Sequence, residues 1–284
     1  MSKDGFLVNQ YHKVKPSPDV AHLKTALITG ASSGLGSEFA RQLASAGYNL
    51  VLTARRDNRL RELANTLHRN YSVDIQVHLA DLSQPLDIES LVSIINSQPC
   101  LDLLVNNAGF GTVGSFYQVD TNKEQAMLNV HVVAPVMLTR ASLPGMLSRH
   151  HGGIIFVASI AGLIPIRNVL YHSTKSFQIH FLEVLQLELH GSGVYLQALC
   201  PGYTVTGFHD TSEYTHFTRR SVPHFLWMTS EQVVSESLKA LPRNRLFCFP
   251  GLINKIAGTF ARSPVLSGII KSVSRSMLYR QKAL

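Results

Sequence analysis

The stretch 29-TGASSGLG-36 follows the apolar run KTALITG at 24–30 and precedes SEFARQLASAG at 37–47, which has helical periodicity. A strand, a glycine-rich turn and a helix in this order are typical of a dinucleotide site, because the turn approaches a phosphate closely and the helix N-terminus offers free N–H groups. The alternative is a glycine-rich turn without a ligand. We predict a dinucleotide-binding turn formed by Gly30, Ser32, Ser33, Gly34, Leu35 and Gly36.

The rest of the chain repeats the alternation of short apolar runs with longer stretches of helical period. Such alternation indicates βαβ units, whose right-handed crossovers place parallel strands in one sheet with helices on both faces. The sequence therefore predicts an α/β fold with a single Rossmann-type, doubly wound parallel sheet of about seven strands. We expect these strands at 24–30, 48–54, 73–79, 101–106, 153–158, 194–200 and 245–249.

Length and charge divide the chain into three parts. With 284 residues, 45% of them hydrophobic, it suits one large domain at 24–250, preceded by an extension at 1–23 and followed by a tail at 251–284. The net charge of +8 belongs to the C-terminal end, because no Asp or Glu follows Glu236. A basic charge confined to one end, without a recognition motif, argues against nucleic-acid binding.

Cysteine usage and hydropathy bear on the compartment. The three cysteines (Cys100, Cys200 and Cys248) are far apart and lack metal-ligand spacing, which predicts free thiols in a reducing compartment and no metal site. The N-terminus has no apolar core of signal-peptide length, and no run of about 18 apolar residues occurs. We expect a cytoplasmic protein that does not span a membrane.

The end of the second expected strand bears on the choice of dinucleotide. A carboxylate there would bind the ribose hydroxyl of NAD, whereas arginine accommodates the 2′-phosphate of NADP. The strand ends with Arg55 and Arg56, whose guanidinium groups suit phosphate oxygens, so NADP is the predicted cofactor and NAD is less favoured. Alternatively, the arginines form a solvated strand end and Asp57 serves NAD, although we interpret Asp57 as the cap of the next helix.

Further motifs follow the later strands in order: Asp81-Leu82, NNAG at 106–109, Asn129, Ser159, Tyr171 with Lys175, and Pro201-Gly202. Together with the glycine-rich turn they resemble the short-chain dehydrogenases/reductases from about residue 24 to about residue 250. The segments FGTVGSF at 110–116 and FPGLINK at 249–255 resemble a broad group of NADP-dependent reductases of undefined substrate. The resemblance implies an oxidoreductase that interconverts a ketone or aldehyde and an alcohol.

The resemblance also implies the catalytic roles. Tyr171 would be the general acid or base, and Lys175, four residues later, would lower the phenol's pKa and hold the nicotinamide ribose. Ser159 would hydrogen-bond the substrate oxygen, and Asn129 would anchor a water in a proton relay behind Lys175. We interpret His172 as a helix-face residue that points away from Tyr171.

The remaining motif positions are implied to bind the cofactor. Asp81 and Leu82 would contact the adenine region, and the NNAG segment would line the adenosine side. The segment after the sixth strand would border the nicotinamide. Alternatively, NNAG is a strand-end turn and Pro201-Gly202 a loop breaker. The implied contacts of the last two segments are Asn107, Ala108, Gly109, Pro201, Gly202, Thr204 and Thr206.

A lid segment at 203–228 is expected to cover the substrate. Its aromatic residues, with Leu163 and Ile164, would line a pocket for a lipophilic carbonyl compound; alternatively, they pack the lid against the core. The lid residues concerned are Phe208, Phe217, Phe225, Leu226 and Trp227.

The tail and the assembly leave alternatives open. From Pro264 onward, apolar residues form one stripe opposite Lys271 and Arg275, which is typical of a basic amphipathic helix on a membrane surface. The alternative is packing on the protein's own body or on a second subunit. The family resemblance implies a homo-oligomer. A non-catalytic dinucleotide sensor or scaffold on the same fold is the alternative function, and it would not need Tyr171.

Overall fold

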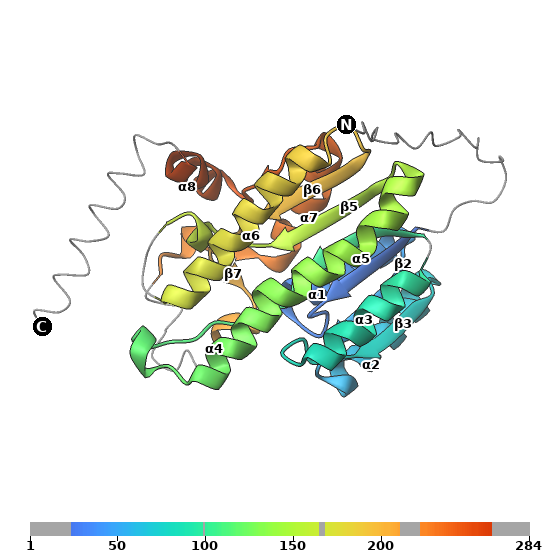
Figure 1. Ribbon diagram of the computed structural model, residues 1–284, viewed down its shortest axis with the longest axis horizontal. Coiled ribbons are helices and arrows are strands. Elements are labelled where there is room, and N and C mark those ends of the chain that lie inside the picture. Colours follow the sequence, from blue (N-terminus) through green and yellow to red (C-terminus); the bar gives the residue numbers. More distant parts are fainter. Residues whose placement is uncertain (1–23, 99, 165–167, 211–221, 263–284) are drawn as a thin grey trace, which may run out of the picture.

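The computed structural model describes residues 24–98, 100–164, 168–210 and 222–262. Its main sheet has seven parallel strands in the order β3-β2-β1-β4-β5-β6-β9, which confirms the predicted doubly wound α/β fold (Figure 1). The strands are β1 (Thr25–Thr29), β2 (Asn49–Ala54), β3 (Ile75–Leu79), β4 (Leu101–Asn106), β5 (Gly152–Val157), β6 (Val194–Leu199) and β9 (Phe247–Cys248). The strand order reverses between β1 and β4, and a ligand crevice is expected beyond their carboxyl ends.

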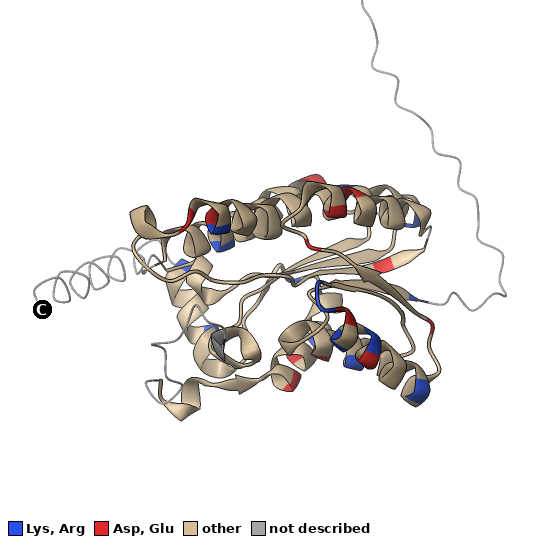
Figure 2. Ribbon diagram, turned by 90° about the horizontal axis from the view of Figure 1, so that it is seen from below, with Lys and Arg blue, Asp and Glu red and all other residues tan. Residues whose placement is uncertain are grey.

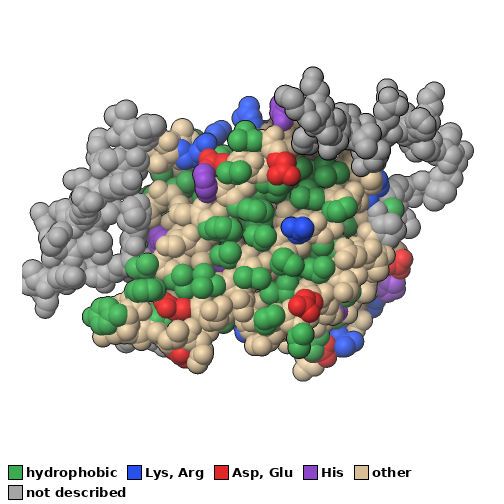
Figure 3. All heavy atoms as spheres, in the orientation of Figure 1, with side chains coloured by type: hydrophobic (Ala, Val, Ile, Leu, Met, Phe, Trp, Pro, Cys, Tyr) green, Lys and Arg blue, Asp and Glu red, His purple; other side chains and the backbone are tan. Residues whose placement is uncertain are grey.

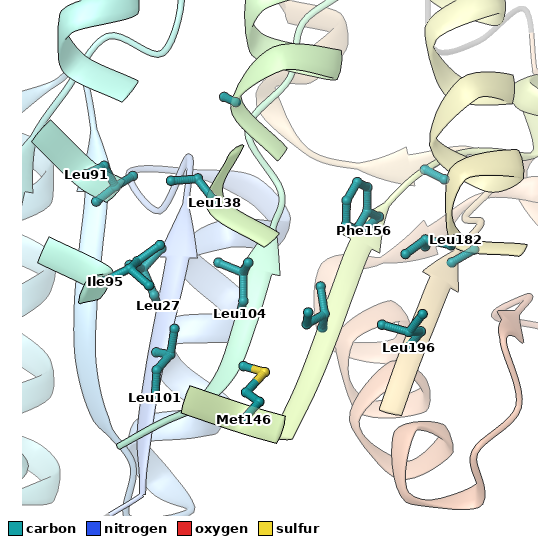
Figure 4. Close-up of a cluster of buried hydrophobic side chains, with 14 of the residues drawn as sticks. Leu27, Leu91, Ile95, Leu101, Leu104, Leu138, Met146, Phe156, Leu182 and Leu196 are labelled. Carbon is teal, nitrogen blue, oxygen red and sulfur yellow. The ribbon is translucent and has the colours of Figure 1, made fainter. Parts of the chain in front are cut away.

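Helices cover both faces of the sheet, which lies between two helical layers (Figure 2). One layer contains α1 (Gly34–Ser45), α2 (Asp57–Tyr71) and α7 (Ser230–Ala240), whose apolar residues share a buried cluster with β1 and β2. The other contains α3 (Pro85–Ser97), α4 (Thr121–Leu128), α5 (Ala134–Arg149) and α6 (Val169–Glu188). Figure 4 shows its cluster, in which Leu91, Leu138 and Leu182 from three helices meet Leu27 and Phe156 of the sheet.

A π-helical turn, η2 (Asn129–Val133), joins α4 to α5. The continuous helical run Thr121–Arg149 has the length and composition of a membrane-crossing helix. However, Met127, Ala134, Leu138 and Met146 are fully buried in the core. The run thus has the apolar character of a helix that packs on a sheet.

The segment expected to form the lid is described at 203–210 and 222–228. It contains β7 (Thr204–Val205), which pairs in parallel with β8 (Met228–Thr229), and the short 3-10 turns η4 (Gly207–Asp210) and η7 (His224–Leu226). Three further 3-10 turns are η1 (Phe116–Gln118), η3 (Ile160–Gly162) and η8 (Leu241–Arg243).

The expected tail begins with α8 (Leu252–Arg262), which packs on the body of the protein. Gly258 lies against the Phe249 ring, and the Arg262 guanidinium stacks 3.6 Å above the Phe247 ring centroid. The expected extension at 1–23 and the amphipathic stripe from Pro264 lie outside the described residues.

Candidate active site

The glycine-rich turn lies at the carboxyl end of β1, where the backbone passes close to the segment after β4. Gly30 has φ +67°, and a Cβ atom there would lie 2.9 Å from Ala108 Cα. A Cβ atom on Gly36 would lie 2.5 Å from Asn107 Nδ2. Only glycine fits both positions, so the turn forms a backbone cradle of the kind that accepts a pyrophosphate at a helix N-terminus.

Thr29 joins this turn to the NNAG segment. Its Oγ1 accepts hydrogen bonds from the N–H groups of Asn107 (2.9 Å) and Ala108 (3.0 Å), and Asn107 Nδ2 donates to the Thr29 carbonyl (2.8 Å). Sequence reasoning assigned Thr29 no role. The sequence does show a hydroxyl residue at the end of the strand, but its hydrogen-bond partners after β4 can be identified only once β1 is known to pair with β4.

Arg56 lies beside the glycine-rich turn. Its Nη2 donates to Ser33 Oγ (2.6 Å) and Ser32 Oγ (2.9 Å). Partial burial, followed by the positive charges of Arg59 and Arg55, lowers the Arg56 pKa from its usual value. A guanidinium between two hydroxyl groups, with further positive charge nearby, suits a phosphate monoester.

The two predicted phosphate-binding arginines have different partners. Arg55 Nη1 lies 3.7 Å from Asp81 Oδ2, so its exposed guanidinium already faces a carboxylate. The expectation that Asp57 caps α2 is wrong, because Arg56 is the N-cap residue and Asp57 Oδ1 instead accepts from Arg61 Nε at 2.8 Å. Of the residues predicted to contact the cofactor at the end of β2, Arg56 is therefore the one whose side chain lies against the glycine-rich turn.

The side chains of Asp81 and Leu82 also lie in different surroundings. The carboxylate of Asp81 accepts from the Ser83 N–H (3.0 Å) and lies beside Arg55, at the edge of the crevice. The side chain of Leu82 is buried in the core. The polar group that this pair offers to a ligand is thus the Asp81 side chain.

Asn168 positions Tyr171 at the start of α6. It has φ +72°, and its Oδ1 accepts from the Tyr171 N–H at 3.4 Å. Its Nδ2 donates to the Thr112 carbonyl, so the start of α6 is tied to the segment after NNAG. Asparagine is a favoured helix cap and tolerates a positive φ, which is the signal that sequence reasoning missed here.

Lys175 lies one turn after Tyr171 and is buried, with only 4% of its surface exposed. Its Nζ lies 5.8 Å from the Tyr171 ring centroid and donates to the Val157 carbonyl at 2.7 Å. This bond ties α6 to the end of β5, from which Ser159 follows. Ser159 Oγ accepts from the Ala161 N–H (3.1 Å), and its own proton can still be donated to a substrate oxygen.

The electrostatic environment of Lys175 favours its neutral form. Burial lowers the pKa of its ammonium to about 7. Burial raises the pKa of the Cys200 thiol to about 12, so this thiol is neutral near pH 7. The site therefore contains a lysine that changes charge near neutrality.

The structure does not bring Asn129 to Lys175. Asn129 Nδ2 donates to the Ser83 carbonyl (2.7 Å), and its Oδ1 accepts from Gln125 Nε2 (3.3 Å). The residue that faces α6 is His131, two positions later in the π-helical turn and fully buried. The Asn129 amide is thus bonded to Ser83 and Gln125, and its implied role in a relay behind Lys175 stays a prediction.

His131 connects the segment after NNAG with α6. Its Nε2 accepts from the Phe110 N–H (3.1 Å), so in the neutral ring Nδ1 carries the proton and donates to Thr174 Oγ1 (2.9 Å). Burial, followed by the charge of Lys175, lowers the His131 pKa well below its usual value. A protonated Nε2 would face the Phe110 N–H as a second donor, so the network requires the neutral ring.

Three rings surround Tyr171. The centroid of its ring lies 5.8 Å from that of His131, 5.9 Å from that of His172 and 6.0 Å from that of Phe208. The expectation that His172 points away is wrong: its ring meets Tyr171 edge to face, because His172 Nδ1 is held at 2.9 Å from the Asn168 carbonyl.

The described lid residues divide between the pocket and other surroundings. Phe208 lies against Tyr171, whereas Trp227 packs on Tyr203 with ring centroids 5.3 Å apart. Phe225 is 70% exposed, and Leu163 packs against the hydrophobic core. Phe217 lies outside the described residues. Packing is thus observed for Trp227 and Leu163, and pocket lining stays a prediction for which Phe208, beside Tyr171, is the described lid aromatic in position.

The segment after β6 closes over the glycine-rich turn. The Pro201 carbonyl accepts from the first N–H of η3 at 3.2 Å, next to Ser159. Thr204 Oγ1 donates to the Gly202 carbonyl (3.2 Å). A Cβ atom on Gly34 would lie 3.3 Å from Thr206, so this implied cofactor contact reaches the turn itself.

Comparisons with known proteins agree with this geometry. A family model described as short chain dehydrogenase matches residues 24–215. The uncharacterized oxidoreductase YmfI of Bacillus subtilis (strain 168) is 39% identical over 197 residues, which cover 69% of this chain and 78% of that protein.

Two solved structures share the fold over most of both chains. A short-chain dehydrogenase from Sphingobium yanoikuyae in complex with NADPH has 28% identity and a TM-score of 0.76, and the match covers 90% of this chain and 96% of that one. The bulky-bulky ketone specific alcohol dehydrogenase from Comamonas testosteroni has 28% identity and a TM-score of 0.73, with 91% and 95% covered. The chain therefore belongs to the short-chain dehydrogenase family and is an oxidoreductase that acts on CH–OH or C=O groups.

Proposed function

We propose that this protein is an NADPH-dependent oxidoreductase that interconverts a lipophilic ketone or aldehyde and its alcohol, with Tyr171 as general acid or base. The observation that carries the proposal is the arrangement on α6, where Tyr171 lies one turn before the buried Lys175 and Lys175 is bonded to the strand that leads to Ser159. A dinucleotide sensor or scaffold would not need this arrangement.

The residues suit the cofactor. Glycine at positions 30 and 36 lets the turn pack closely on Asn107 and Ala108, where any Cβ atom would collide with the protein, and a tight turn of this kind before a helix N-terminus suits a pyrophosphate. Arg56, with Ser32 and Ser33, offers donors to a 2′-phosphate, which supports NADPH over NADH. When bound, NADPH supplies the hydride.

The protein's own residues would handle the substrate oxygen and the proton. The Ser159 hydroxyl would donate a hydrogen bond to the carbonyl oxygen and orient it. Tyr171 would give its phenolic proton to the same oxygen during reduction and take it back in the reverse direction. Lys175 in its charged form would stabilise the resulting phenolate.

The surroundings of Tyr171 support a lipophilic substrate. Phe208 and His172 lie within 6.0 Å of its ring centroid, and Phe110 packs edge to face on His131 at 5.9 Å. Pockets lined by aromatic groups with few polar atoms favour apolar ligands. The similarity to an alcohol dehydrogenase specific for bulky ketones points to the same class.

The test is a panel of lipophilic ketones and aldehydes with NADPH, followed by loss of absorbance at 340 nm. We expect Tyr171→Phe to lower kcat at least a hundredfold while NADPH still protects the protein thermally. Tyr195→Phe, on β6, is the matched control and should keep activity. Equal activity of wild type and Tyr171→Phe would contradict the mechanism.

The cofactor preference is tested separately by Arg56→Ala, with Arg59→Ala as a control of equal charge. Loss of a charge-assisted contact of about 1.5–3 kcal/mol should weaken NADPH binding tenfold or more and leave NADH binding nearly unchanged. Equal effects of the two substitutions would mean that general positive charge, and not the position of Arg56, sets the preference.

We also propose a homo-oligomer. Apolar side chains are exposed along the outer faces of α5 and α6, visible in Figure 3, and a patch of this kind marks protein interfaces. They are Met137, Leu147, Phe177, Val184 and Leu187. Light scattering coupled to gel filtration should give a multiple of 31.4 kDa, reduced by Val184→Lys with Leu187→Lys. A monomeric wild type would contradict this.

A further inference from the structure

The carbonyl of His131 lacks the partner that an α-helix would provide. In an α-helix the carbonyl of residue i accepts from the N–H of residue i+4, and here that residue is Pro135, which has no N–H. The chain instead forms the π-helical turn Asn129–Val133, in which the Ala134 N–H bonds to the Asn129 carbonyl. The His131 carbonyl therefore needs a donor from elsewhere.

Gln178 supplies this donor from α6. Its Nε2 donates to the His131 carbonyl at 2.8 Å, and its Oε1 accepts from Lys175 Nζ at 3.2 Å. Gln178 and Lys175 are 2% and 4% exposed. The orientation of the amide follows from its partners, because its NH₂ group faces a carbonyl and its oxygen faces an amine.

The remaining surroundings of Lys175 make this contact important. Among the described residues, the ionisable groups that act on it come from three elements: His131 of η2, Tyr171 of α6 and Cys200 after β6. None of the three is a carboxylate. The charged form of Lys175 thus depends on two uncharged acceptors, the Val157 carbonyl and Gln178 Oε1.

We propose that Gln178 is a positioning residue that holds the Lys175 amine beside Tyr171 by linking it directly to the freed carbonyl of His131. Its importance for turnover rests on the proposed function. Its effect on Lys175 is independent of any substrate.

The test measures the titration of Lys175 itself, in the full-length protein labelled with [6-¹³C]lysine. The Lys175 signal is assigned by its loss in Lys175→Met. Gln178→Leu removes the acceptor, so the titration midpoint should fall by about one pH unit. Gln178→Glu places a carboxylate at the amine, so the midpoint should rise by about 1–3 pH units.

A matched control is Gln197, which with Gln178 makes up the buried glutamines among the described residues and bonds both the carbonyl and the hydroxyl of Ser237. It is 0% exposed, and its Nε2 donates to the Ser237 carbonyl at 3.0 Å, away from Lys175. Gln197→Leu should therefore cost stability without moving the Lys175 midpoint. If Gln178→Leu does not fold, Gln178→Glu decides alone.

The proposal is overturned if the folded Gln178 variants titrate at the wild-type midpoint, or if Gln197→Leu moves it equally. This result is distinct from failure of the proposed function. If the midpoint shifts as expected but no carbonyl compound is reduced, the positioning role stands and the substrate class is wrong. If reduction occurs but the midpoint never moves, the reductase stands and Gln178 has no such role.

Discussion

Lys175→Met should remove a specific pH dependence from the stability of the fold. In the folded protein the pKa of Lys175 is about 7, against 10.5 for an unperturbed lysine. Between these values the unfolded chain binds a proton that folded Lys175 lacks, so stability rises with pH; below pH 7 both states are protonated and the full penalty applies. This pKa difference lowers the free energy of unfolding by about 5 kcal/mol at low pH. About 2 kcal/mol of that destabilisation should disappear between pH 7 and pH 9.

The assay is urea unfolding at intervals from pH 6.5 to pH 9, followed by far-UV circular dichroism. Lys175→Met cannot titrate, and the acceptors that it leaves unpaired impose a cost that does not vary with pH. Across this interval, the free energy of unfolding of the wild type should therefore increase by about 2 kcal/mol relative to that of the variant. Lys239→Met, on the exposed side of α7, is the control and should run parallel to wild type. Parallel curves for wild type and Lys175→Met would refute the reasoning.

Other substitutions test the supports of the site. Gly36→Ala drives a methyl group against the Gly30 carbonyl and should cost about 1–3 kcal/mol and most of the dinucleotide affinity, measured by thermal shift. Asn168→Gly keeps the positive φ but loses the side-chain bonds, and should cost about 1 kcal/mol in urea unfolding together with a lower kcat; an unchanged kcat would mean that the cap is purely structural. Of the cysteines, only Cys100 should react with iodoacetamide at pH 8, because the other two are buried with pKa values of about 12; mass spectrometry of the native protein would reveal any exception.

The fold was largely predictable because its strands are short, continuous apolar runs between glycine-rich or polar turns. All seven expected strands occur in the main sheet, although β9 retains only Phe247 and Cys248 of the expected 245–249. The two-stranded pair β7–β8 was not predicted. Two-residue strands carry no readable alternation, and their pairing depends on how the lid returns to the body.

The site was predictable where a motif lies at a strand end, and less so inside the long helix. Asn129 belongs to the family pattern by spacing, but the π-helical turn decides which side chains face α6, and they are those around His131. Pro135, a proline near the start of a helix segment, was a visible sign that the regular period would break. The bond from Gln178 to the His131 carbonyl involves that break and could not be read from periodicity, whereas Gln178 and Lys175 are three residues apart on α6 and share a helix face by its regular period.

The single tryptophan of the chain occupies a useful position. Trp227 closes the expected lid segment, and its ring packs on Tyr203, which begins it. Intrinsic fluorescence excited at 295 nm therefore arises from this one place, without interference from the two helical layers. The protein carries its own optical reporter of the two ends of the lid segment, so any change there on binding of cofactor or of successive carbonyl compounds can be followed in stopped-flow experiments without an attached label.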